Sequence, residues 1–196
     1  MNKLFIATLL ITITFILGCK ENPNKQGESK DESDTTSIIE KGKEIAFSTF
    51  LSLSSELEKA MKSGGVEHAL KYCNLNAIGI TDSLSKVHDV SIKRTSMKHR
   101  NPKNAPSEDE KAVLLHFENR KNSGGVMEPY VVKGSDKNIF YAPIIVQDMC
   151  LKCHGPKEEI ENYDLIKKHY PEDLAVGYIQ GNLRGMWSIE FKKENL

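Results

Sequence analysis

The chain has 196 residues, and its 27 basic and 27 acidic side chains give a formal net charge of zero. Hydrophobic residues make up 39% and charged residues 28%, as in globular domains, so nothing points to a basic surface for nucleic acid. The only long apolar run lies at the N-terminus, which excludes a multi-span membrane protein, and the length suits one domain with appendages.

The N-terminus has the pattern of an export signal. Lys3 precedes an apolar stretch over residues 4–17, which is too short to cross a bilayer as a helix. Gly18 and Cys19 follow, and this ending resembles the bacterial lipobox. We therefore expect removal of residues 1–18, lipidation of Cys19, and a membrane-anchored lipoprotein on the periplasmic or outer-surface side. An ordinary cleaved signal or an uncleaved anchor is the alternative.

A polar segment separates this signal from the rest of the chain. Residues 20–37 contain no aliphatic or aromatic side chain, so they bury too little surface to fold. We expect residues 19–38 to be the lipidated cysteine and a disordered tether. The folded domain is expected over residues 39–192, followed by a tail at 193–196.

Two helices are expected to open the folded domain. Apolar residues at heptad-like spacing predict a helix over residues 38–61, which Gly64 and Gly65 end. The second helix places four apolar residues on one face: Val66, Ala69, Leu70 and Cys73.

Strands dominate the remainder of the chain. Alternating apolar residues predict them at 90–97, 130–132, 139–146 and 186–191. Ser107 and Glu110 form a capping box before a third helix over residues 112–117, and a last helix is expected near residues 159–169. Helices first and mostly antiparallel strands afterwards favour an α+β fold.

Cys150-Leu151-Lys152-Cys153-His154 is a C-x-x-C-H sequence, the attachment site of c-type haem. Two thiols at this spacing reach the two vinyl groups of one porphyrin, and the histidine lies beneath the iron as the proximal ligand. Haem c is attached outside the cytoplasm, in agreement with the export signal. We therefore expect one covalent haem c, bound by Cys150 and Cys153, with His154 as an iron ligand.

Two other uses of these cysteines stay open. Cys150 and Cys153 could form a disulfide outside the cytoplasm. Alternatively, Cys73, Cys150, Cys153 and His154 make a Cys₃His set that suits structural zinc. In either case the protein would be a non-haem lipoprotein that acts as a binding module.

Several residues could supply a sixth ligand for the iron. With the other three cysteines assigned, Cys73 is left unpaired, either as a buried small hydrophobe or as the ligand opposite His154. Arg94 and Arg184 could pair with haem propionates or face solvent. The remaining candidates for the sixth ligand are Met97, His99, His116, Met127 and Met186.

A family resemblance bears on these alternatives. Five segments occur in a characteristic order: residues 69–73, 94–96, 100–106, 150–154 and 181–185. This pattern resembles a bacterial family of single-haem c-type proteins, long catalogued as a domain of unknown function, whose reference member is cyanobacterial. The likeness covers residues 39–192. It implies a PAS-like α+β fold, Cys73 as the second axial ligand, and family-typical positions for Arg94 and Arg184.

A haem held by Cys73 and His154 would favour one-electron chemistry at low potential, because a thiolate stabilises ferric iron. Two functions follow: electron transfer with a redox partner, or sensing of redox state or a gas such as CO or NO through a sensor protein. With two protein ligands the iron has no open position, so we expect no enzymatic activity.

Overall fold

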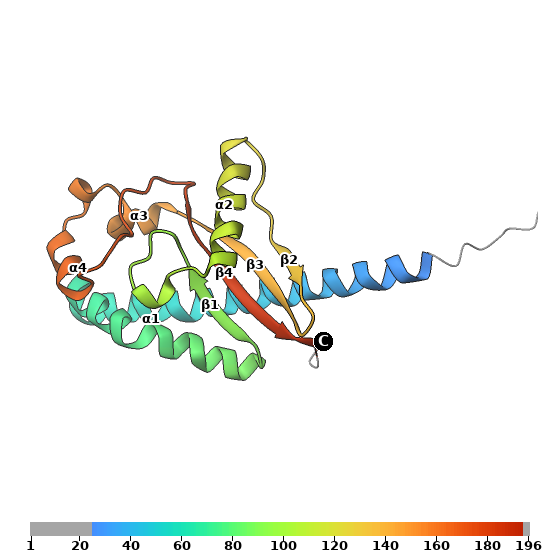
Figure 1. Cartoon of the computed structure of the whole chain (residues 1–196). Helices are drawn as coiled ribbons and strands as arrows, with labels where there is room; N and C mark the ends of the chain where they lie inside the picture. Colours follow the sequence, from blue (N-terminus) through green and yellow to red (C-terminus); the bar gives the residue numbers. More distant parts are fainter. Residues whose placement is uncertain (1–24, 194–196) are drawn as a thin grey trace, which may run out of the picture.

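A four-stranded antiparallel sheet lies between helices in the computed structural model, which describes residues 25–193 (Figure 1). The strands are β1 (Ser91–Thr95), β2 (Tyr130–Lys133), β3 (Lys137–Ile145) and β4 (Leu183–Lys192). Their order across the sheet is β1-β4-β3-β2, so the last strand of the chain pairs with both the first and the third. The expected α+β fold with an antiparallel sheet and N-terminal helices is confirmed.

The helices are α1 (Lys25–His88), α2 (Glu108–Asn122), α3 (Asp148–His154) and α4 (Tyr163–His169), with short 3₁₀ turns at Pro102–Asn104 and Lys157–Glu159. The last predicted helix therefore begins later than expected. Ile160 has an extended backbone and only 5% exposure, so the chain leaves helical geometry there to bury this side chain against α1 and α4.

Helix α1 consists of two helical halves joined at a kink. Gly64 and Gly65 both have non-helical dihedral angles, and Gly65 has a positive φ of 68°, which glycine adopts at little cost. The second half folds back beside the first (Figure 1), and Tyr72 Oη donates a hydrogen bond of 2.8 Å to Glu56 Oε2. The predicted break between two helices is confirmed.

The prediction of a disordered tether over residues 19–38 is wrong from Lys25 onward, because α1 begins there and Ile38 is only 2% exposed in the core. The polar composition of this segment predicts that it cannot fold by itself. However, adding a turn to a helix that is already anchored avoids the cost of nucleation, so a polar segment can extend it. The predicted signal at residues 1–18 and the lipidation of Cys19 lie outside the described residues.

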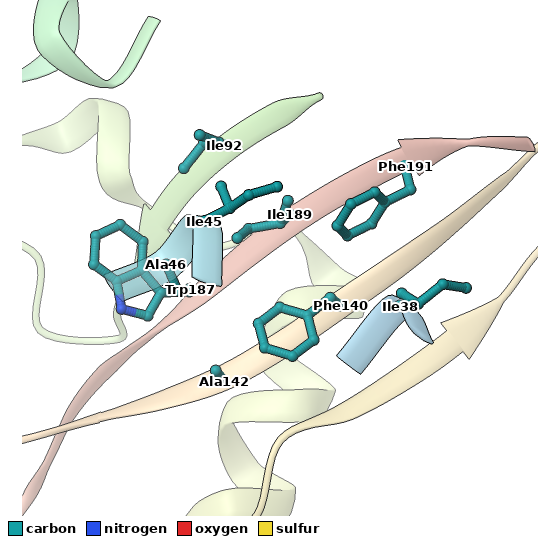
Figure 2. Close-up of a cluster of buried hydrophobic side chains, with 9 residues drawn as sticks. All are labelled: Ile38, Ile45, Ala46, Ile92, Phe140, Ala142, Trp187, Ile189 and Phe191. Carbon is teal, nitrogen blue, oxygen red and sulfur yellow. The ribbon is translucent and has the colours of Figure 1, made fainter. Parts of the chain in front are cut away.

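The main core lies between α1 and one face of the sheet (Figure 2). It comprises nine buried side chains: Ile38, Ile45, Ala46, Ile92, Phe140, Ala142, Trp187, Ile189 and Phe191. Trp187, Ile189 and Phe191 lie on one face of β4, in agreement with the alternation that predicts a strand over residues 186–191, and all three face α1. Between residues 25 and 193, no helix has both the length and the apolar character that a membrane span requires.

Helix α2 covers the opposite face of the sheet. Its capping box forms as predicted, since Ser107 Oγ accepts from Glu110 N at 3.2 Å and Glu110 Oε2 accepts from Ser107 N at 2.9 Å. The second core consists of Val113, Leu114 and Phe117 from α2 and of Tyr141 and Met186 from the sheet. The two faces of the sheet thus carry separate cores.

Gly42 lets α1 approach the sheet closely, since a Cβ built there would lie 2.4 Å from Cγ of Phe140, whose side chain has no exposure. We expect Gly42→Ala to lower the free energy of unfolding by about 1–2 kcal/mol, because overpacking outweighs the gain in helix propensity. Urea unfolding measures this change. The matched control is Gly79→Ala, in an open position of the same helix, which should be neutral or stabilising. Equal effects of the two variants would contradict the close approach.

Candidate functional site

The C-x-x-C-H sequence forms α3, at one end of the molecule. Figure 1 shows α3 beside α4 and the kinked end of α1, away from the β2–β3 hairpin. The side chain of Cys153 packs against a cluster of Leu70, Ile160, Ile166 and Tyr170. Cys150 packs instead against Val146, Ala175 and Tyr178. The two thiols therefore lie against different walls of this end.

His154 is held by the backbone that follows α4. Its Nδ1 lies 2.7 Å from the carbonyl oxygen of Ala175, and the ring of Tyr178 meets the imidazole edge-on with centroids 6.4 Å apart. A carbonyl oxygen only accepts hydrogen bonds, so Nδ1 must carry the proton. The lone pair of the neutral ring is consequently on Nε2, the nitrogen that this contact leaves available to a metal.

The surroundings of His154 also keep its imidazole neutral. Burial lowers the pKa of His154 well below its ordinary value, and the positive charges of Arg184, Arg100 and Arg94 lower it further. The hydrogen bond to Ala175 acts in the opposite direction but does not offset them. A histidine that resists protonation in this way is suited to donate a lone pair.

Arg100 and Asp173 form a buried ion pair next to α3, which sequence reasoning missed as a site feature. Arg100 Nε lies 3.1 Å from Asp173 Oδ1, and Arg100 Nη2 donates to the carbonyl oxygen of Cys153 at 2.6 Å. In the sequence, Arg100 stands out only as part of residues 100–106, one of the five segments that carry the family resemblance. Nothing local in the sequence marks the pair, because its members are far apart in the chain.

Cys73 lies on the second half of α1, one turn after Leu70, which contacts the same cluster as Cys153. Asn74 ties this turn to α4 by donating from Nδ2 to the carbonyl oxygen of His169 at 2.5 Å. Burial raises the pKa of the Cys73 thiol, and the charges of Arg94 and Arg100 oppose that rise. The structure thus brings Cys73 to the same end of the molecule as α3.

Arg94 and Arg184 lie on the neighbouring strands β1 and β4. Arg184 Nη1 donates to Ser96 Oγ at 3.1 Å and to the carbonyl oxygen of Lys98 at 3.0 Å. For Arg94, no hydrogen bond or ion pair joins its guanidinium to any residue between 25 and 193. Burial and the charge of Arg184 lower the pKa of Arg94. A desolvated cation without an anion is suited to bind a carboxylate.

Most of the other candidates for the sixth iron ligand are placed less favourably than Cys73. Met186 and Met127 belong to the core under α2, and His116 meets the ring of Tyr130 edge-on with ring centroids 5.5 Å apart. Met97 is 43% exposed. His99 is the exception, because its carbonyl oxygen accepts from Leu174 N at 3.1 Å and its buried Nδ1 has no partner.

The non-haem alternatives gain no support from the geometry. Cys73, Cys150 and Cys153 are all free thiols, with no disulfide among them. In the described part of the chain, no three Cys, His, Asp or Glu side chains gather closely enough to share a metal ion. Among residues 25–193, the Cys₃His set of the zinc alternative is therefore not assembled.

The fold and the site define a class: an α+β protein that gathers thiols, a neutral imidazole and half-buried arginines at one end of an antiparallel sheet. A family model described as Tll0287-like matches residues 26–191, and the chain belongs to that family. The predicted resemblance is confirmed. Among curated proteins, none matches the chain.

A solved structure shares the fold. The crystal structure of the cyanobacterial heme-protein Tll0287 superposes with a TM-score of 0.58 at 20% sequence identity. The match covers 90% of this chain and 99% of that one. At this identity the likeness establishes the fold, and the predicted fold class is confirmed.

Proposed function

We propose that this protein binds one haem c, attached through Cys150 and Cys153 and ligated by His154 and Cys73. The observation that carries the proposal is the fixed tautomer of His154 inside the C-x-x-C-H helix, since the contact between Nδ1 and Ala175 O leaves Nε2 to coordinate iron. Membership of a family whose namesake is a heme-protein supports it.

The remaining site residues fit the charge of a haem. Its propionates are carboxylates, and Arg94 is a half-buried cation that lacks an anion among residues 25–193. Arg184 lies on the adjacent strand and its backbone oxygen accepts from Ser96 Oγ at 2.6 Å, which fixes this segment. We assign Arg94, with Arg184, to the propionates.

A bound haem of this type supplies one-electron redox chemistry. Cys73 and His154 would both ligate the iron, and a thiolate ligand favours the oxidised state, so we propose low-potential electron transfer or sensing of redox state. Gas sensing would require Cys73 to release its position to a ligand such as CO or NO. We further propose that Cys19 is lipidated and that the domain functions at a membrane surface outside the cytoplasm, with a redox partner or a sensor protein.

The test compares absorption spectra of wild type and Cys73→Ala, oxidised and reduced, after maturation in a host that attaches haem c. We expect a low-spin ferric spectrum with thiolate features in wild type and a marked change in the variant, because one strong ligand is lost. Met97→Ala is the matched control, since this exposed methionine should leave the spectrum unchanged.

Two outcomes would contradict parts of the proposal. Identical spectra for wild type and Cys73→Ala would exclude Cys73 as a ligand and make His99 the next candidate, because its Nδ1 is buried without a partner. Absence of any haem band in wild type would overturn haem binding itself and leave a non-haem binding lipoprotein. Addition of CO to the reduced protein separates the two functions, since only a sensor of this gas needs to bind it.

A further inference from the structure

The ion pair of Arg100 and Asp173 is unusual in being almost entirely buried. The side chains of Arg100 and Asp173 are 12% and 0% exposed, and a second contact joins Arg100 Nη2 to Asp173 Oδ2 at 3.4 Å. Burying two charges costs free energy that their attraction often fails to recover, so this ion pair need not stabilise the fold. The hydrogen bonds that its two members make indicate a second role.

Both members bind the backbone around His154. Asp173 Oδ1 accepts from Ala175 N at 2.9 Å, and Arg100 Nη2 lies 3.4 Å from the carbonyl oxygen of Ala175. That oxygen is the one that receives the proton of His154 Nδ1. Arg100 Nη2 also donates to Cys153 O, directly before the histidine. The pair therefore fixes both polar groups of Ala175 and the end of α3.

We propose that Arg100 and Asp173 are positioning residues that orient His154 and set the reduction potential of the haem that it ligates. This inference rests on the proposed function. Arg100 and His154 share one acceptor, so Arg100 limits how strongly the Ala175 carbonyl draws on the imidazole proton. A ligating imidazole whose Nδ1 proton is drawn away becomes a stronger donor and stabilises oxidised iron.

The two charges of the pair should act on the potential in opposite directions. Reduction adds one electron to the site, so a nearby positive charge favours the reduced state and a negative charge opposes it. Loss of Arg100 leaves the carboxylate of Asp173 uncompensated and frees the Ala175 carbonyl for His154, and both effects lower the potential. Loss of the Asp173 charge leaves Arg100 uncompensated and raises it. Arg94 and Arg184 are present in every variant and do not alter this comparison.

The experiment is a redox titration of purified holoprotein for wild type, Arg100→Met, Asp173→Asn and the double variant. We expect a lower potential for Arg100→Met and a higher one for Asp173→Asn, each seen as a several-fold change in the oxidised-to-reduced ratio at a fixed solution potential. The double variant should lie between them. Glu110→Gln is the control: it breaks the Lys93–Glu110 bridge of 2.6 Å under α2 and should leave the potential unchanged.

If the reduction potentials of both single variants shift in the same direction, or neither shifts, the inference is overturned. A general loosening of the structure would not shift the potential in opposite directions for the loss of a positive and of a negative charge. If Arg100→Met fails to hold haem, Arg100→Lys decides, since it keeps the charge but not the forked hydrogen bonds. A potential of Arg100→Lys near or moderately below wild type supports the inference, and one above it overturns it. Absence of haem in wild type would instead refute the proposed function.

Discussion

Replacing both Cys150 and Cys153 with serine is expected to remove all covalently attached haem, because in the proposed site each thiol would form one of the two thioether bonds. The measurement is haem staining after denaturing electrophoresis, which detects only covalent haem. Each single replacement should leave a reduced amount attached through the remaining thiol.

Cys73→Ala is the matched control for this prediction. Cys73 is also a partly buried free thiol at the same end of the molecule, but we assign it to coordination and not to attachment. Its variant should stain like wild type although its absorption spectrum changes. Haem that stays covalently bound to the double variant would show that another residue forms the linkage.

Gly185→Ala is expected to lower the free energy of unfolding by roughly 3–5 kcal/mol, the largest effect that we expect from adding one methyl group. A Cβ at Gly185 would lie 2.4 Å from the carbonyl oxygen of Thr95, and its φ of 158° is one that other residues rarely adopt. Relief requires β1 and β4 to separate where Arg94 and Arg184 lie. Haem content should therefore fall together with stability.

The control for this prediction is Gly181→Ala in the preceding turn. Gly181 has a φ of 80° but open space around its Cα, so this variant carries conformational strain without a clash. We expect a loss of about 1–2 kcal/mol. Urea unfolding compares the two variants. Equal losses would mean that the backbone conformation, and not the approach to Thr95, makes glycine necessary at residue 185.

Local patterns predicted the elements of the fold well. The alternation of Trp187, Ile189 and Phe191 marked one face of β4, and Ser107 with Glu110 marked the start of α2, because each pattern reports a short-range physical requirement. The prediction of a disordered tether failed because it also used only short-range information. The composition of residues 25–37 shows that they bury little apolar surface. They are helical because they extend the packed helix that follows them, which the composition of the segment cannot show.

Consecutive residues made the C-x-x-C-H part of the site predictable, whereas Cys73, Arg94 and Arg184 were proposed from the cysteine count, side-chain chemistry and the family resemblance. The C-x-x-C-H sequence identified Cys150, Cys153 and His154 as one group. By contrast, Arg100 and Asp173 are far apart in the sequence and meet only in the folded chain, so no sequence motif predicts their ion pair. The partner of His154 Nδ1 is a backbone carbonyl, which every residue possesses, so the sequence could not identify Ala175.

The helical extension of α1 also changes what the N-terminal segment can transmit. Residues 25–37 as a helix span roughly 20 Å, and a flexible coil of the same length has nearly the same average span. The difference is in direction rather than distance. A coil lets the domain tumble at its end, whereas a rod that continues into the core transmits torque. Rotation of the chain at residue 25 would therefore turn the sheet and the His154 end together.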